Sequence, residues 1–197
     1  QKFAYGNSVS SAGDINGDGF DDVIVGAYRA DSNGDYSGSS YVVFGKASGF
    51  DATLDLSNLD GRNGFRLDGG KSGASGSSVS SVGDVNGDGF ADVIVGNRHG
   101  YVLFGQASGF GARVDLSGLN GSNGFRLEGT EDGYDNVVSS AGDVNGDGYA
   151  DVVSGANVYS TSTGRVYTFH SAGTAGVSIT SAGSASNVIT GEVTNSQ

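Results

Sequence analysis

The segment Asp14-Ile15-Asn16-Gly17-Asp18-Gly19-Phe20-Asp21-Asp22 has two further copies in this chain, at 84–92 and 143–151. All three copies share the pattern D-x-N-G-D-G-x-x-D, with no substitution at the acidic, asparagine or glycine positions. A second block, 44–69, matches 104–129 at an offset of 60 residues, with 18 of 26 positions identical. Self-similarity at a period of 59 to 70 residues indicates a repeat protein with three copies of one supersecondary unit.

Each repeat contains four runs of residues with strand character. In the second repeat these runs are 76–83, 92–96, 100–105 and 123–128. The second run is apolar without alternation, which is typical of a strand covered on both faces, whereas the fourth alternates like a strand near an exposed edge. Four short strands in 60 to 70 residues describe one blade of a β-propeller, while a β-sandwich domain needs about 100 residues.

The sequence therefore predicts an all-β fold of three four-stranded antiparallel propeller blades. The expected boundaries are 1–70 for blade 1, 71–130 for blade 2 and 131–197 for blade 3, the last with a less typical C-terminal tail. Because a closed propeller needs about 4–8 blades, these three are expected to form part of a closed propeller or of an assembly of blades. Their open faces would pack against further blades of a longer chain or against other copies of this one.

The composition excludes several functional classes. Glycine occurs 37 times among the 197 residues, and proline, cysteine, methionine and tryptophan are absent. Without cysteine there is no disulfide framework and no thiolate metal site. The formal net charge of −12 argues against nucleic acid as a partner. The lack of a run of about 18 apolar residues argues against membrane insertion.

The repeated loop places oxygen ligands in a pattern that suits a hard cation. Side chains at positions 1, 3 and 5, the backbone carbonyl at position 7 and a bidentate carboxylate at position 9 would supply the oxygens that Ca²⁺ takes. Magnesium fits this loop less well because it demands stiff octahedral geometry, and zinc or copper would want imidazole or thiolate ligands. A metal-free turn rich in Asp and Asn is the alternative. We expect three Ca²⁺ ions, with these ligands: Asp14, Asn16, Asp18, Phe20 and Asp22; Asp84, Asn86, Asp88, Phe90 and Asp92; and Asp143, Asn145, Asp147, Tyr149 and Asp151.

The loop begins like an EF-hand loop but closes differently. An EF-hand loop ends on an acidic residue at position 12 and leads into a helix. Position 12 here is Val25, Val95 or Ser154, none of which carries a carboxylate, and the residues around it have strand character. The last metal ligand of the loop is therefore expected at position 9, and the loop is expected to connect two strands.

The elements Tyr5-Gly6, the acidic loop and Gly26-Ala27 resemble the FG-GAP repeat of integrin α-subunit β-propellers and of related bacterial-type surface or secreted proteins. The resemblance implies propeller blades, usually seven in a closed ring, with calcium between the first two strands of a blade. The chain departs from the family pattern at the proline of GAP, where Tyr28, Arg98 and Asn157 stand instead.

These observations predict a calcium-binding structural or adhesion module of an extracellular or cell-surface protein, with an unidentified protein or glycan ligand. Extracellular calcium modules bind with dissociation constants of about 10⁻⁴–10⁻³ M, which suits that location. No catalytic residue is expected, because the chain has no G-x-S-x-G elbow and metal binding already accounts for the paired carboxylates. The alternatives are a carbohydrate-binding surface, with Tyr28, Tyr36 and Tyr159 as candidate contacts, and a non-catalytic part of a larger secreted enzyme.

Overall fold

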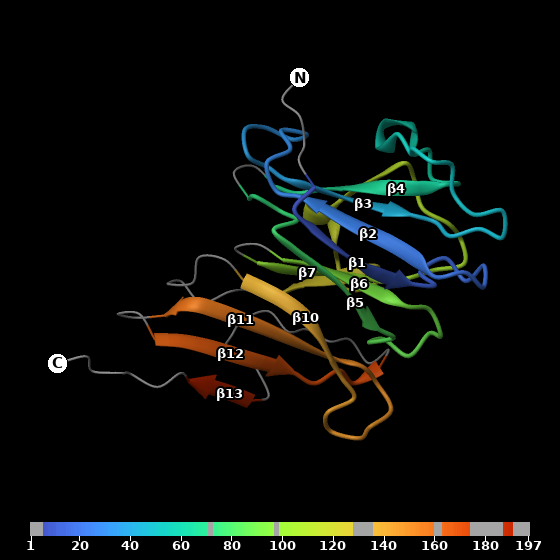
Figure 1. Cartoon of the computed structure of the whole chain (residues 1–197). Coiled ribbons are helices and arrows are strands. Elements are labelled where there is room, and N and C mark those ends of the chain that lie inside the picture. The colour runs from blue at the N-terminus through green and yellow to red at the C-terminus, as the bar shows by residue number, and fades with distance from the viewer. Residues whose placement is uncertain are drawn as a thin grey trace.

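A computed structural model describes residues 6–70, 73–96, 99–127, 136–159, 163–173 and 187–190. Within these ranges the chain folds into three β-sheets with no α-helix, and only two short 3-10 turns, Leu56–Asn58 and Leu116–Gly118, interrupt the strands. No helix in these ranges is long and apolar enough to cross a membrane. The three sheets follow one another along the chain (Figure 1), which confirms the prediction of an all-β, blade-like architecture.

Each sheet is a meander of four strands in chain order. Blade 1 contains β1 (Ser8–Gly13), β2 (Asp22–Ala27), β3 (Ser39–Val43) and β4 (Gly64–Asp68). Blade 2 contains β5 (Ser78–Gly83), β6 (Asp92–Gly96), β7 (Gly100–Leu103) and β9 (Gly124–Leu127). Blade 3 contains β10 (Asn136–Gly142), β11 (Asp151–Tyr159), β12 (Thr163–Phe169) and β13 (Asn187–Thr190).

The strand runs expected in the second repeat are confirmed to within two residues at each end. All neighbouring strands within a meander are antiparallel, and each first strand has a register shift at the same repeat position, two residues before its end. The predicted blade boundaries stay predictions, since 71–72 and 128–135 lie outside the described residues. Most of the expected C-terminal tail, 174–186 and 191–197, lies outside them as well.

A fifth strand on the first sheet is the feature that the sequence did not predict. Strand β8 (Arg113–Asp115) comes from the connection between β7 and β9 of blade 2, yet it pairs in parallel with β4 of blade 1. The backbone N–H of Arg66 also donates to the carbonyl of Ala112 at 3.0 Å. We call 109–116 the arm of blade 2, and it joins two successive blades along their outer edge.

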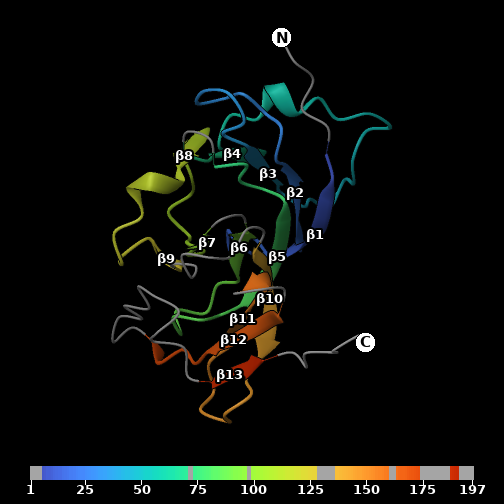
Figure 2. The same cartoon turned by 90° about the vertical axis from the view of Figure 1, so that its left-hand side faces the viewer.

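The apolar core lies between the sheets. The first strands β1, β5 and β10 lie side by side, so that neighbouring sheets face one another (Figure 2). One cluster of buried side chains joins blades 1 and 2, and a second joins blades 2 and 3. Within β6, Val93 and Val95 belong to the first cluster and Ile94 to the second, which is why this strand has no polar face.

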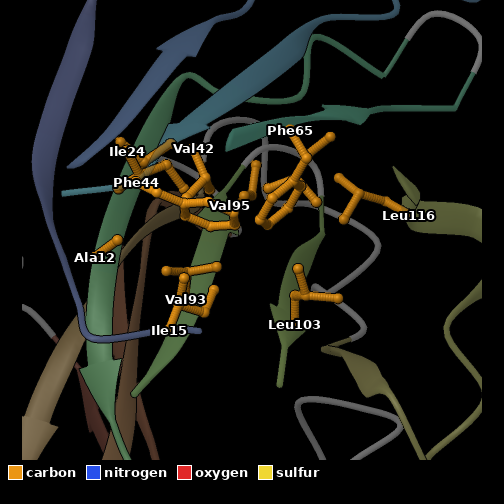
Figure 3. Packing of buried hydrophobic residues seen from close by; sticks show 12 residues of the cluster. Ala12, Ile15, Ile24, Val42, Phe44, Phe65, Val93, Val95, Leu103 and Leu116 are labelled. Carbon is orange, nitrogen blue, oxygen red and sulfur yellow. The ribbon is translucent and has the colours of Figure 1, made fainter. Parts of the chain in front are cut away.

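The first core contains the aromatic residues Phe44 and Phe65 (Figure 3), and Phe110 packs against it. Phe65 is fully buried, and the ring of Phe110 from the arm stacks on it with 4.2 Å between ring centroids. Phe44 lies against both rings, at 5.8 Å and 6.3 Å. Phe104 and Phe125 repeat this packing in the second core, with 5.8 Å between their ring centroids.

Replacing Gly26 by alanine tests how closely two blades approach. A Cβ on Gly26 would lie 2.2 Å from the carbonyl oxygen of Gly76. Because the backbone fixes the positions of both atoms, one sheet has to shift. We expect Gly26→Ala to lower the free energy of unfolding by about 1–3 kcal/mol, the usual cost of overpacking, measured by urea denaturation.

Gly155 provides the matched control, because it holds the same repeat position in blade 3. There, among the described residues, the nearest atom to an added Cβ is the carbonyl oxygen of Val137, 3.8 Å away. Gly155→Ala should therefore change the free energy of unfolding by less than about 0.5 kcal/mol. Equal destabilisation by the two variants would contradict the proposed close contact.

Candidate metal centre

Each acidic loop joins the first and second strand of its blade, at 14–21, 84–91 and 143–150. The chain turns sharply here because the glycines at positions 4 and 6 have left-handed backbones, with φ of 73° at Gly17 and 89° at Gly19. The corresponding glycines of the other two loops have nearly the same angles. A residue with a Cβ is disfavoured in this conformation, so the repeated glycines are needed to form the loop.

The side chains at positions 1, 3 and 5 gather on the backbone of their own loop. The backbone N–H of Asp18 donates both to Oδ1 of Asp14, at 3.0 Å, and to Oδ1 of Asn16, at 2.9 Å. The amide of Asn16 in turn donates to Oδ2 of Asp18 at 3.0 Å. The structure therefore brings three of the five predicted ligand residues together in loop 1.

The other two loops repeat this arrangement. Asn86 donates to Asp88 at 2.8 Å, and Asn145 donates to Asp147 at 2.8 Å. In both loops the backbone N–H at position 5 again donates to the side-chain oxygens at positions 1 and 3. One local geometry thus recurs three times.

The aspartate at position 9 has a different environment from the other three positions. Asp22 is buried, and its two carboxylate oxygens accept backbone N–H groups from Gly45 at 2.8 Å and from Ile15 at 3.1 Å. Asp92 accepts from Gly105 and Val85 in the same way. Asp151 accepts from Ser171 and Val144. We call this pair of bonds the latch, because it ties the loop to the chain just beyond the third strand.

The latch is not predicted by the sequence pattern. The pattern indicates position 9 only as a bidentate metal ligand and indicates no role for the backbone N–H groups of Gly45, Gly105 and Ser171. The signal that could have pointed to it is the repeated Phe-Gly pair at 44–45 and 104–105. A Cβ at Gly45 would lie 2.4 Å from the carbonyl oxygen of Asp21, so the loop and the segment after β3 touch through their backbones.

The donor chemistry of the loops fits calcium. Every candidate donor is a carboxylate, amide or carbonyl oxygen, the ligand type that Ca²⁺ prefers. In the part of the chain that the structure describes, no group of three or more His, Cys, Asp or Glu side chains is close enough to hold a metal ion. The position-9 carboxylate is turned to the latch, but each of its oxygens keeps a second lone pair. Ligation by position 9 and by the position-7 carbonyl stays a prediction.

Burial and neighbouring charge make the carboxylates of Asp22 and Asp92 costly to ionise. Burial raises the pKa of Asp22 from 3.8 to about 6, the latch bonds lower it, and the charges of Asp18 and Asp14 raise it further. Burial likewise raises the pKa of Asp92 to about 7. The loops therefore concentrate negative charge that a cation would offset.

With this geometry in view, the comparisons with known proteins identify the family. The FG-GAP repeat model matches residues 5–43, 75–112 and 136–169, which together make up more than half of the chain. Each matched stretch includes one acidic loop and the strands on both sides of it. The chain therefore belongs to the FG-GAP repeat family, which confirms the resemblance inferred from the sequence.

Several curated relatives are integrin α chains. Integrin alpha-6 of Homo sapiens is 27% identical over 60% of this chain and 10% of its own length. Integrin alpha-4 of Xenopus laevis is 32% identical over 47% of this chain and 8% of its own length. Integrin alpha-3 of Cricetulus griseus is 29% identical over 68% of this chain and 13% of its own length. The chain thus spans about a tenth of the length of these relatives.

Two aspartate variants should distinguish the structural role of the latch from that of an exposed candidate ligand. In the presence of a chelator, Asp92→Ala should lower the free energy of unfolding by about 1–3 kcal/mol, because it leaves two backbone N–H groups in a buried site without an acceptor. Asp88→Ala removes an exposed side chain and should cost less than about 1 kcal/mol. Urea denaturation measures both values. If Asp92→Ala costs no more than Asp88→Ala, the latch is not a structural element.

The raised pKa values predict the pH dependence of the metal-free protein. Asp22 and Asp92 have folded-state pKa values above 3.8, so between about pH 4 and pH 7 the folded chain binds protons that the unfolded chain releases. Stability must therefore fall as the pH rises through this window. Urea midpoints of chelator-treated protein should decrease between these pH values, and Asp92→Ala should weaken the decrease. A midpoint that rises over the same window would contradict the raised pKa values.

Proposed function

We propose that this chain is a calcium-binding structural and adhesion module of an extracellular or cell-surface protein. The observation that carries the proposal is the threefold recurrence of one loop geometry, in which the oxygens at positions 1, 3 and 5 gather between the first two strands of each blade. A loop that served only as a turn would not need the same four acidic and amide positions in every blade.

Calcium has a clear physical role in this arrangement. Nine of the 22 acidic residues are loop aspartates, three in each repeat. A divalent cation would offset their mutual repulsion and stabilise the folded state by binding it in preference to the unfolded chain. With no cysteine available for disulfides, calcium would replace them as the element that holds the loops in place.

An adhesive role is supported by the family and by the pattern of exposed aromatic residues. The integrin α relatives favour a protein ligand over a glycan one. Of the tyrosines proposed for glycan binding, Tyr36 is exposed, whereas Arg29 lies over the ring of Tyr28 at 5.1 Å and the side chain of Tyr159 is outside the described residues. The connection 27–40 stands where the second repeat has only 97–100, and we call it the insertion of blade 1. A single exposed tyrosine on this insertion is a small platform, so we favour protein binding.

Calcium titration tests this proposal. Isothermal titration of the chelator-treated chain with CaCl₂ should give a stoichiometry of three, and calcium at 100 times its dissociation constant should stabilise the fold by about 2.7 kcal/mol for each site. Asp88→Asn should reduce the stoichiometry to two. Asp35→Asn, which removes an exposed charge from the insertion, is the matched control and should keep it at three. An unchanged melting temperature together with no heat of binding would refute the proposal.

A further inference from the structure

Successive acidic loops, which we number with their blades, touch one another through their backbones. The backbone N–H of Ala91, at position 8 of loop 2, donates to the carbonyl of Asp14, at position 1 of loop 1, at 3.2 Å. The backbone N–H of Ala150 in loop 3 donates in the same way to the carbonyl of Asp84 in loop 2, at 3.1 Å. Each loop is therefore bonded to the first residue of the loop before it, at both internal blade interfaces.

An aromatic ring accompanies each of these hydrogen bonds. The ring of Phe90, at position 7 of loop 2, packs on Gly17, at position 4 of loop 1, where an added Cβ would lie 2.4 Å from a ring carbon. The ring of Tyr149 in loop 3 lies at the same distance from an added Cβ on Gly87 of loop 2. A side chain at position 4 would displace the ring, so this glycine is needed for the contact between loops as well as for the turn.

The residues that touch are themselves candidate metal ligands or their direct neighbours. Phe90 and Tyr149 carry the carbonyls that are expected to ligate at position 7, and Asp14 and Asp84 are the candidate ligands at position 1. A position-1 aspartate therefore offers its side chain to its own site and its carbonyl to position 8 of the next loop. A cation that fixed the backbone of one loop would also restrict the backbone of its neighbour.

We propose that these contacts make the cation sites cooperative, so that an occupied loop raises the affinity of the loop next to it; this inference rests on the calcium binding proposed above. Binding that orders one segment lowers the cost of ordering a segment already bonded to it, which couples two sites without a change of fold. By linkage the coupling is reciprocal, and it typically changes affinity by about 5- to 150-fold. We expect the second ion of an adjacent pair to bind at least about five times more tightly than the first, after statistical correction.

Electrostatics between the sites opposes this coupling, because the first bound cation reduces the negative potential that attracts the second. Positions 4 to 6 of all three loops are exposed to solvent. At an ionic strength of about 0.15 M, charges separated by more than about 8 Å are largely screened in such surroundings. Titrations at this ionic strength therefore report mainly on the contact between the loops.

The middle site decides the cooperativity, because the contacts join neighbouring loops. Asp18, Asp88 and Asp147 all hold position 5 of their loops, and replacing any one of them by asparagine should remove one site and leave two. Asp18→Asn leaves the adjacent sites 2 and 3, and Asp147→Asn leaves the adjacent sites 1 and 2. Asp88→Asn leaves sites 1 and 3, whose blades are separated by blade 2.

Calcium titrations of these three variants test the proposal. Competition with a chromophoric chelator, in about 0.15 M NaCl, should give Hill coefficients above about 1 for Asp18→Asn and Asp147→Asn. The Hill coefficient of Asp88→Asn should be about 1 or lower, because its two sites do not adjoin. The three variants carry the same substitution at the same loop position, so they differ in which sites remain next to each other.

Phe90→Ala tests the contact itself. In the Asp147→Asn background it removes the ring that joins the two remaining sites, so the second ion should lose its gain in affinity. In the Asp18→Asn background the remaining sites are joined through Tyr149, and the same substitution should leave the gain unchanged. If alanine unfolds the metal-free chain, which its melting curve would show, Phe90→Leu takes its place with the same expectation for each background.

The outcomes separate this inference from the proposed function. Two ions bound by each variant, with Hill coefficients of about 1 or lower for the adjacent pairs, would overturn the cooperativity and leave calcium binding intact. Equal cooperativity in Asp88→Asn and in the other two variants would overturn the loop contact as its cause. A parent chain that binds no calcium would overturn both the proposed function and this inference.

Discussion

Apolar contact between successive sheets is the constraint on which the rest of this structure depends. A single four-stranded sheet has two faces and no interior, so no blade can bury its own apolar side chains. The clusters that join blades 1 and 2 and blades 2 and 3 are therefore the only cores in the described part of the chain. The close backbone approach at Gly26 and the burial of every residue of strand β6 follow from this arrangement.

The candidate metal loops are coupled to that core through the latch. Ile15 and Val85, at position 2 of their loops, are fully buried between blades, and their backbone N–H groups donate to the position-9 carboxylates. The same carboxylates hold the chain beyond the third strand. A change in the charge of Asp22 or Asp92 would therefore alter hydrogen bonds of residues that pack between neighbouring sheets. Cation binding in such a loop would act on the blade interface as well as on the loop.

The parts of the structure that the sequence predicted are those encoded within a single repeat. The acidic loop, its obligatory glycines and the four strands of each blade depend on residues close together in the chain, and threefold repetition made their pattern visible. The family assignment rests on the same local signals. Strand ends could be placed to within two residues because glycine and the acidic loop mark the turns.

The parts that the sequence did not predict are contacts between distant segments. Strand β8 has three residues, too few to show a period, and it forms because β4 of the preceding blade offers an edge. The latch joins Asp22 to Gly45, 23 positions away, through a backbone N–H that leaves no side-chain signature. Neither contact can be read from one repeat alone, because each needs the position of a second strand.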